Sequence, residues 1–346
     1  MTAQVTERLW VFLGSIALVA LIISLALMVL LRPWLARYAT VQPNARSSHL
    51  RPTPQGGGIA VVIATLLVAS GAILAWPPLL ENQSGQFLAL TAATTLLALV
   101  GVMDDMRSLS AAARLAMQCI AVGAVIAALP AELKIIPQLP WSVERAGLFL
   151  GGVWFVNLVN FMDGIDWLTV AEVVPVTGAI LVLGLVGTVG ALPAVVAAAL
   201  LGATAGFAPF NRPVAQVFLG DVGSLPIGLL LGWLLLQLAA TDHLAAALIL
   251  PLYYLADATI TLGRRLIRGE AIWRAHRTHF YQRATDHAFT VPQIVARVFA
   301  ANLALAVLAL IAVAAHKVVV SLAMLSAAAA MILWLLATFA TGKPRG

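Results

Sequence analysis

Long apolar runs constrain the fold of this chain most, because each has about the 20 residues that a helix needs to cross a bilayer. Eleven such runs, separated by polar or Pro- and Gly-rich breaks, follow one another along the 346 residues. They lie near 9–31, 57–76, 87–103, 113–130, 146–162, 167–187, 190–208, 224–240, 244–262, 293–314 and 318–340. The pattern predicts an all-α, polytopic integral membrane protein with ten or eleven transmembrane helices.

The composition agrees with a membrane protein. Only 10% of the residues are charged and the mean hydropathy is +1.00, whereas roughly 25% charge is usual in a soluble domain. We therefore expect one integral-membrane domain over residues 1–346. The run at 9–31 is too long for the core of a signal peptide, and no small-residue cleavage pattern follows it, so we expect it to remain as a span.

The distribution of Lys and Arg predicts the orientation in the membrane. If the N-terminus lies outside, sixteen of the 20 basic residues fall on or beside the inside loops. The four left outside are Arg8, Lys134, Arg145 and Lys317. We therefore expect a periplasmic N-terminus. The net charge of +6 is then first a sign of topology, and we expect no nucleic-acid partner.

Aspartates gather at the predicted inside ends of the helices. They are Asp104, Asp105, Asp163, Asp166 and Asp221, in three different inside loops. A carboxylate in hydrocarbon costs about 2.5–3.5 kcal/mol on insertion scales, so such a concentration indicates a functional site. Helix capping alone would explain an isolated acid, but not acids accompanied by asparagines and glycines.

The stretch NLVNFMDGIDWL combines amide and carboxylate side chains. As a helix it would place Asn157, Asn160 and Asp163 on one face near the inner end. Gly164 then frees the backbone to turn, and Asp166 brings a second carboxylate. Oxygen donors without thiols suit Mg²⁺, which takes one or two carboxylates together with water and phosphate oxygens.

Two other stretches carry acids at helix ends. VGVMDDMRSL places Asp104 and Asp105 side by side, and since neighbours on a helix point about 100° apart, only one can easily face a given ligand. One of them can hold a metal or act as a base while the other orients it. FLGDVGSLPIG sets Asp221 between Gly220 and Gly223 before a new helix, where backbone amides and a carboxylate can approach one phosphate–metal cluster.

The longest polar segment, 263–292, is rich in arginine and histidine. If helical, His276 and His279 would share a face with Arg283. Arginine binds phosphate through two parallel hydrogen bonds, and histidine can donate to phosphate or shuttle protons. The alternative is a solvated loop attracted to anionic lipid. Zinc is not expected, because no third ligand of zinc spacing accompanies the two histidines.

The first inside loop, NARSSHLRPTPQGGGIAV, adds a second basic segment. His49 and Arg51 precede Gly56 and Gly57, part of a triple glycine that enters a helix. We expect this turn to expose backbone amides to a phosphate or nucleotide. It is not a P-loop, because no Lys-Ser/Thr pair follows the glycines.

Five motifs, in the order HLRPTPQGGGIA, GVMDD, NLVNFMDGID, FLGDVGS and HRTH, resemble those of the polyprenyl-phosphate N-acetylhexosamine-1-phosphate transferases. That superfamily, glycosyltransferase family 4, includes the enzymes that initiate O-antigen, enterobacterial common antigen and teichoic acid. It also includes the peptidoglycan translocase for phospho-N-acetylmuramoyl-pentapeptide. The resemblance spans residues 45–290, which is most of the chain.

The resemblance implies a multi-pass enzyme of the bacterial inner (cytoplasmic) membrane with its active site at the cytoplasmic face. Undecaprenyl phosphate would attack the β-phosphorus of a UDP-N-acetylhexosamine, giving a polyprenyl-diphosphate sugar and UMP. Mg²⁺ is the implied cofactor, with Mn²⁺ as its substitute, and a homodimer is left open. A phosphate near neutral pH already has a nucleophilic oxygen, so a dedicated base is optional.

Residue by residue, the resemblance makes Asp221 the principal Mg²⁺ ligand, supported by Asn160. Four aspartates match catalytic positions: the pair Asp104 and Asp105, which deprotonates or positions the lipid phosphate, and Asp163 and Asp166 of the DGxDG loop. The expected substrate-binding residues are His49, Arg51, Gly56, Gly57, Asn157, His276, Arg277 and His279.

The sequence departs from the family pattern at three places. Trp167 stands where the family usually has glycine, Ser108 stands where a fuller DDxxD motif has its third acid, and HRTH lacks three successive histidines. The last departure favours the branch that initiates O-antigen or other surface glycans, with a UDP-FucNAc, UDP-QuiNAc or UDP-GlcNAc donor. A transferase for the peptidoglycan precursor is the alternative.

A secondary transporter is the rival from another class of protein. It would place acids near the middle of the bilayer and often carries two related half-repeats. Here the informative acids gather at one face and no repeat is found, so the sequence favours the transferase.

Asp257 lies within the predicted ninth span, one or two helical turns before Arg264 and Arg265. A buried acid of this kind usually needs a partner. We expect a structural ion pair with one of the two arginines rather than a catalytic role.

Overall fold

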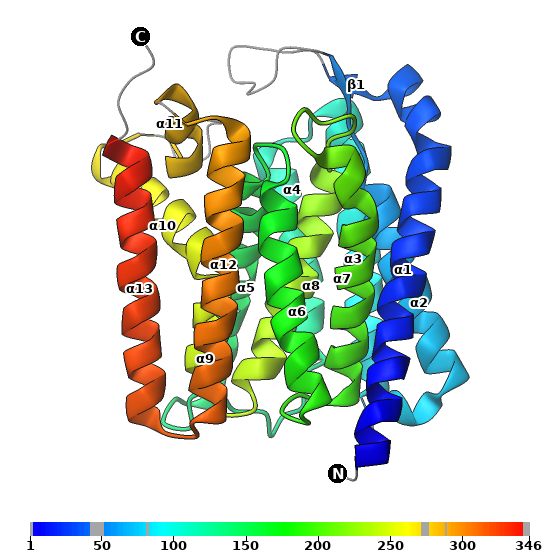
Figure 1. Ribbon diagram of the computed structural model, residues 1–346, viewed down its shortest axis with the longest axis vertical. Helices are drawn as coiled ribbons and strands as arrows, with labels where there is room; N and C mark the ends of the chain where they lie inside the picture. The colour runs from blue at the N-terminus through cyan, green and yellow to red at the C-terminus, as the bar shows by residue number, and fades with distance from the viewer. Residues whose placement is uncertain (1–2, 42–51, 81–82, 271–276, 288, 342–346) are drawn as a thin grey trace.

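The computed structural model describes residues 3–41, 52–80, 83–270, 277–287 and 289–341. Its helices run roughly parallel in one bundle, with the N-terminal helix at one edge and the C-terminal helix at the other (Figure 1). Nine of the described helices are long and apolar enough to cross a membrane. The chain is therefore a polytopic, all-α membrane protein, while the number of crossings and the orientation stay predictions.

The nine long helices are α1 (Ala3–Tyr38), α2 (Gly58–Ala75), α3 (Ser84–Arg107), α5 (Trp141–Met162), α6 (Leu168–Leu185), α7 (Ala191–Asn211), α8 (Asp221–Ala239), α12 (Val291–Ala314) and α13 (Val318–Thr341). Helix α4 (Ala111–Ala127) is apolar but shorter, at 17 residues. A 3-10 helix, η1 (Pro77–Leu80), follows α2. Ten of the eleven predicted apolar runs coincide with a helix, with ends shifted by a few residues.

The remaining run, 244–262, is not one continuous helix, and this prediction is wrong. It divides into α9 (Leu244–Ile249) and α10 (Leu252–Ile267). Pro251 stands at the break, because proline has no N–H with which to continue the helical hydrogen bonds. A last short helix, α11 (Phe280–Asp286), precedes α12.

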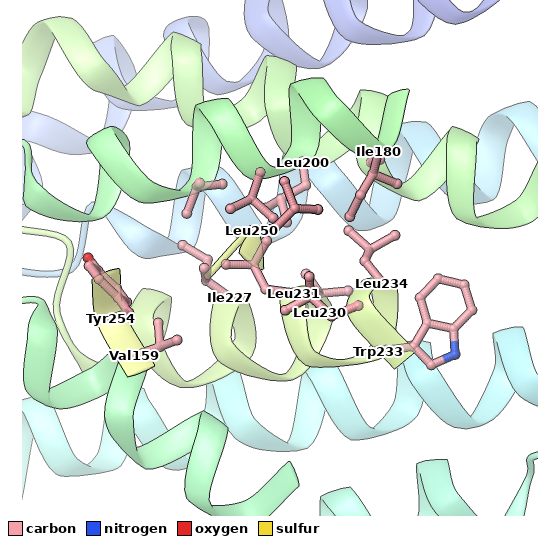
Figure 2. Close-up of a cluster of buried hydrophobic side chains, with 14 of the residues drawn as sticks. Val159, Ile180, Leu200, Ile227, Leu230, Leu231, Trp233, Leu234, Leu250 and Tyr254 are labelled. Atoms are coloured by element: carbon pink, nitrogen blue, oxygen red, sulfur yellow. The ribbon is translucent and has the colours of Figure 1, made fainter. Parts of the chain in front are cut away.

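Helix α8 occupies the centre of the bundle and is almost entirely buried. Its leucines Leu230, Leu231 and Leu234 pack among Ile180 of α6 and Leu200 of α7 (Figure 2). A helix that is apolar on every face is buried in protein or in lipid, and α8 is enclosed by other helices. The enclosure of α8 fixes the position of its first residue, Asp221.

Glycines bring the start of α8 against two neighbouring helices. A Cβ atom on Gly58 of α2 would lie 2.2 Å from the Cα of Gly223, and one on Gly101 of α3 would lie 2.3 Å from the amide nitrogen of Val222. Only residues without side chains permit such close backbone contact between membrane helices. The start of α2, the end of α3 and the start of α8 therefore meet at one point.

The described parts of the polar motifs lie at one end of the bundle. A two-stranded antiparallel ribbon of β1 (Thr40–Val41) and β2 (Thr53–Pro54) lies at this end, together with α11 (Figure 1). Gln55, directly after β2, pairs with Phe218 before α8. Helices α3, α5 and α7 end here and α8 and α12 begin here, which gathers their terminal side chains.

Candidate active site

A cavity of about 250 Å³ lies among these helix ends. It mixes polar and apolar side chains, which include Gln55, Asn160, Asp163, Ile165, Asp166, Asn211, Phe218, Leu219, Asp221, Gln282 and Val291. The structure thus brings together Asn160, Asp163, Asp166 and Asp221, four of the residues singled out in the sequence.

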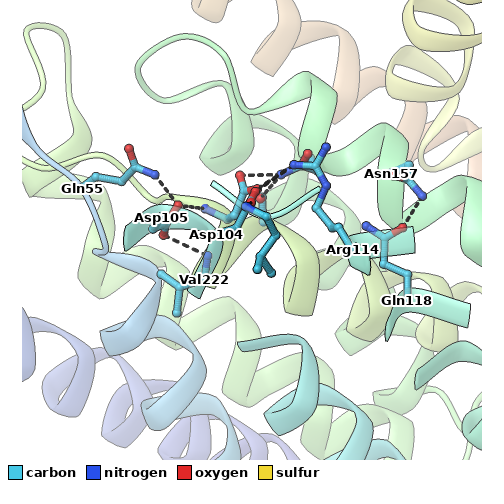
Figure 3. Close-up of polar contacts among 11 residues, drawn as sticks. Gln55, Asp104, Asp105, Arg114, Gln118, Asn157 and Val222 are labelled. Carbon is cyan, nitrogen blue, oxygen red and sulfur yellow. Dashed lines mark hydrogen bonds and ion pairs between the residues drawn. The ribbon is translucent and has the colours of Figure 1, made fainter. Parts of the chain in front are cut away.

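Asp105 caps the start of α8. Its carboxylate accepts a hydrogen bond from the backbone N–H of Asp221 (3.0 Å) and another from that of Val222 (3.2 Å). The Nε2 of Gln55 donates to the same carboxylate (Figure 3). The first N–H groups of a helix have no partner inside it, and a negative charge there is stabilising. Asp105 therefore fixes the backbone that carries Asp221.

Arg114 of α4 joins two of the aspartates. Its Nη1 lies 2.9 Å from Oδ2 of Asp104 and 3.3 Å from Oδ2 of Asp221 (Figure 3). The N–H of Leu109 also donates to Asp104 at 2.5 Å. From sequence alone, Arg114 is one of the sixteen basic residues on or beside the inside loops, which indicate only the topology. Arg114 lies in the first turn of α4, the helix that follows Asp104 and Asp105. This position indicates that Arg114 lies at the same end of the bundle as the two aspartates.

Asn160 is adjacent to Asp221, as the expected metal pair requires. Its Nδ2 donates to Oδ1 of Asp221 and to the hydroxyl of Ser224, both at 2.8 Å. Asn157, one turn earlier on α5, does not line the cavity. Its Nδ2 donates at 2.6 Å to Oε1 of Gln118 on α4, so this side chain joins two helices (Figure 3).

The loop after α5 holds Asp163 and Asp166 by hydrogen bonds. The hydroxyl of Thr169 donates to Asp163 at 2.5 Å, and the N–H of Ala215 donates to Asp166 at 2.9 Å. Burial, reinforced by the nearby carboxylates, raises the pKa of Asp163 to about 8. A cation in the cavity would favour the ionised form.

Trp167, the departure from the family glycine, adopts a left-handed backbone conformation with φ 65°. Its N–H donates to Oδ1 of Asn211 (2.8 Å) and its indole N–H to the carbonyl of Ala208 (2.6 Å). Glycine adopts this conformation without strain, whereas a large side chain rarely does. The two hydrogen bonds to the end of α7 help to hold Trp167 in this unusual conformation.

Gly56 and Gly57 do not offer their amides to a ligand, contrary to our expectation. Both N–H groups donate to the carbonyl of Phe218, at 3.1 and 2.9 Å. A Cβ on Gly57 would lie 2.4 Å from the ring of Phe207, so the glycines are needed for close packing. They hold the segment before Asp221 in place.

The expected pairing of Asp257 is also wrong. Arg265 pairs with Glu270 at 3.0 Å, and Asp257 instead accepts hydrogen bonds from the start of α11. His279 is buried against Asp257, with its Nδ1 3.2 Å from Oδ1, and it does not line the cavity. Its position shows that it supports α11.

The other residues expected to bind substrate lie outside the cavity or outside the described residues. Arg277 pairs with Asp286 at 3.3 Å and donates to the hydroxyl of Thr285 at 2.7 Å. His49, Arg51 and His276 lie outside the described residues.

The donor set fits a hard divalent cation. Asp221 and Asp104 supply carboxylate oxygens, Asn160 brings a side-chain amide beside Asp221, and the guanidinium of Arg114 already places positive charge between the two carboxylates. Within the described residues, no group of three or more His, Cys, Asp or Glu side chains is arranged to hold a metal ion. An open site with few protein ligands is what Mg²⁺ prefers when phosphate oxygens complete its shell.

The sequence of this chain matches known proteins over the helices from α3 to α8. Residues 87–239 match the model of glycosyl transferase family 4. A decaprenyl-phosphate N-acetylglucosaminephosphotransferase of Mycolicibacterium smegmatis is 31% identical over 56% of this chain and 52% of its own length. The chain thus spans about half of that relative.

Two further relatives align over more of their length. A probable undecaprenyl-phosphate N-acetylglucosaminyl 1-phosphate transferase of Bacillus subtilis is 26% identical over 77% of this chain and 76% of its own. A phospho-N-acetylmuramoyl-pentapeptide-transferase of Gluconobacter oxydans is 32% identical over 63% of this chain and 70% of its own. The resemblance seen in the five motifs is confirmed: the chain belongs to glycosyl transferase family 4, the superfamily of polyprenyl-phosphate N-acetylhexosamine-1-phosphate transferases.

Proposed function

We propose that this protein transfers an N-acetylated amino-sugar 1-phosphate from a UDP-sugar to undecaprenyl phosphate at the cytoplasmic face of a bacterial inner membrane. An oxygen of the lipid phosphate forms a bond to the β-phosphorus of the UDP-sugar. The bond from that phosphorus to the bridging oxygen breaks, and UMP leaves. The products are an undecaprenyl-diphosphate sugar and UMP.

One observation carries the proposal: Asp221 is held at the cavity by side chains from three other helices. Asp105 caps its helix, Asn160 donates to its carboxylate, and Arg114 pairs with it. Phosphoryl transfer needs positioning and charge neutralisation more than covalent help from the protein. A rigid carboxylate beside an arginine, at one end of a bundle of membrane-spanning helices, supports that chemistry.

Mg²⁺ is the cofactor that we propose, with Mn²⁺ as a substitute. Asp221 and Asn160 would hold it, and Asp104 lies near enough to share Arg114 with Asp221. A bound Mg²⁺ neutralises diphosphate charge and makes the phosphorus more electrophilic. Asp105 has both oxygens engaged in capping α8, so its role in this proposal is to orient Asp221.

The protein side chains bind and orient the two phosphates. The guanidinium of Arg114, which has several donors in one plane, can shift from the carboxylates to a phosphate oxygen when a metal ion neutralises Asp104 and Asp221. Asp163 and Asp166 line the cavity through a loop fixed by Thr169 and Ala215, and they give its wall a defined shape. No protein base is required, because the lipid phosphate is already anionic near neutral pH.

The sugar that we propose is of the GlcNAc, FucNAc or QuiNAc type, used to initiate O-antigen or another surface glycan. Two relatives are named for N-acetylglucosamine phosphate transfer. The motif HRTH lacks the three successive histidines of the peptidoglycan translocase. Transfer of phospho-N-acetylmuramoyl-pentapeptide is the second candidate, because the Gluconobacter oxydans relative is named for it.

Release of UMP tests the proposal directly. The purified protein is supplied with undecaprenyl phosphate, Mg²⁺ and, one at a time, UDP-GlcNAc, UDP-FucNAc, UDP-QuiNAc and UDP-N-acetylmuramoyl-pentapeptide. We expect metal- and lipid-dependent UMP from one of the first three donors. Asp221→Asn should abolish it, while Asp242→Asn, at the opposite end of α8, should not. UMP only from the pentapeptide donor would reverse the sugar assignment, and no UMP from any donor would contradict the reaction.

A further inference from the structure

Helix α11 depends on a carboxylate from another helix for the hydrogen bonds at its start. Asp257 of α10 is fully buried and accepts from the N–H of Phe280 (3.0 Å) and from that of Tyr281 (3.1 Å). These are the first two N–H groups of α11, which no carbonyl within the helix can satisfy. Asp257 therefore caps α11 from outside.

The surroundings of Asp257 compensate for the burial of its charge. The Nδ1 of His279 lies 3.2 Å from Oδ1, and the hydroxyls of Thr261 and Tyr253 lie at 3.3 and 3.5 Å from the carboxylate. A buried carboxylate is tolerated when hydrogen bonds satisfy its oxygens, and removing one member of such a network leaves others unpaired. The network therefore fixes the start of α11 relative to α10.

Through Tyr281, the position of α11 reaches the cavity wall. The hydroxyl of Tyr281 donates at 3.0 Å to the carbonyl of Phe161, in the last turn of α5. It also fills the space beside Gly164, where a Cβ atom would lie 2.0 Å from the hydroxyl oxygen. Tyr281 thus contacts and supports the loop that carries Asp163 and Asp166.

Gln282, the next residue of α11, lines the cavity itself. Its Oε1 accepts from the N–H of His279 at 3.3 Å, which ties the side chain to the capped end of the helix. The start of α11 therefore positions both Tyr281, which supports the 163–166 loop, and Gln282, a polar side chain of the cavity.

We propose that Asp257, with His279, is a positioning residue for the wall of the active-site cavity formed by residues 163–166. Asp257 holds α11, and α11 positions Tyr281, which supports this wall, and Gln282, which lines the cavity. Neither Asp257 nor His279 needs to touch substrate in this arrangement. The inference rests on the proposed function for its kinetic consequence, but its structural consequence is independent of any reaction.

The structural test is amide hydrogen exchange of the whole protein in detergent without substrate. In Asp257→Asn and in Tyr281→Phe, we expect exchange of residues 163–169 to increase by about tenfold or more, because local opening becomes easier. Asp286→Asn is the matched control, because it removes an exposed carboxylate at the other end of α11 and should leave exchange unchanged. Unchanged exchange in both test variants would overturn the proposal. Tyr281→Phe removes one hydroxyl only, so it tests the proposal even if Asp257→Asn does not fold.

The kinetic test separates positioning from catalysis. In Tyr281→Phe and Asp257→Asn, we expect the KM for at least one of the two substrates to rise by about tenfold while kcat changes less than about threefold. The double variant should be little worse than the single ones, because both changes release the same loop. A fall in kcat with an unchanged KM for both substrates would overturn the proposal. If wild-type protein turns over no donor, the reaction is wrong, and the exchange experiment still decides the role of Asp257.

Discussion

At the scale of single residues, Asp105 shows how hydrogen-bond geometry distinguishes between three roles that the sequence left open. An aspartate beside another aspartate could act as a base, hold metal or orient its neighbour. Both oxygens of Asp105 accept from the first N–H groups of α8, so its geometry is that of a helix cap. A cap and a general base also differ in the effect of losing the side chain. Loss of a cap costs about 1 kcal/mol of stability, whereas loss of a general base lowers the reaction rate by roughly 10²- to 10⁴-fold.

This difference predicts the behaviour of two substitutions at Asp105. Asp105→Asn keeps one oxygen acceptor but cannot take up a proton, and we expect it to retain at least about a tenth of the wild-type kcat/KM. Asp105→Leu has the same branching at Cγ and no acceptor, and it should lose both thermal stability and activity. Steady-state UMP release and a melting curve measure the two effects. If Asp105→Asn is as inactive as Asp221→Asn, the capping interpretation is wrong.

At the scale of elements, glycines decide how closely helices approach the site. Gly58 of α2 lies against Gly223 of α8, where a Cβ atom would be 2.2 Å from the Cα of Gly223. Gly71, in the same helix, has nothing within 4 Å of the place where its Cβ would stand. The sequence distinguishes the two only weakly, because both are glycines in an apolar run, and the contact partner lies far away in the chain.

The pair therefore gives a matched test of packing. Gly58→Ala must push α2 away from α8, at a cost of about 1–3 kcal/mol, and it should lower the melting temperature and reduce activity by displacing Asp221. Gly71→Ala should leave activity unchanged and stabilise α2 slightly, by about 0.5–1 kcal/mol, since alanine is the better helix former. Melting temperature and UMP release are compared for both. Equal effects of the two substitutions would contradict the close contact at Gly58.

Other elements show where local patterns are sufficient and where they fail. Apolar runs predicted ten helices because burial in lipid or protein requires little more than length and hydropathy. The prediction for the ninth run failed because it considered only hydropathy, although Pro251 interrupts the helix within this run. Gly56 and Gly57 suggested an exposed phosphate-binding turn, but their amides are satisfied by Phe218, a partner that no local pattern indicates.

At the scale of the whole molecule, the alternation of helices across a membrane explains why the acids could be placed together from sequence. Residues on alternate loops share a side, so Asp104, Asp163 and Asp221 were expected at one end, and they lie there. Alternation predicts on which side of the membrane a residue lies, but not which other residues it contacts. Arg114, Gln55 and Gln282 reach the site through tertiary contacts between distant segments, which no local pattern specifies.

Alternation also makes the orientation testable. The chain has one cysteine, Cys119, so a Cys119→Ala background lets single cysteines report accessibility. With the N-terminus outside, Asp242→Cys should react with a membrane-impermeant maleimide in intact cells, because residue 242 lies at the opposite end of α8 from the aspartates. Arg107→Cys, at the end of α3 that carries Asp104, should react only after the cells are made permeable. The reverse pattern would place the acidic cavity outside, where no cytosolic UDP-sugar reaches it. Because the proposed donor is charged and cannot cross the bilayer, such a result would contradict the transferase reaction as well as the orientation.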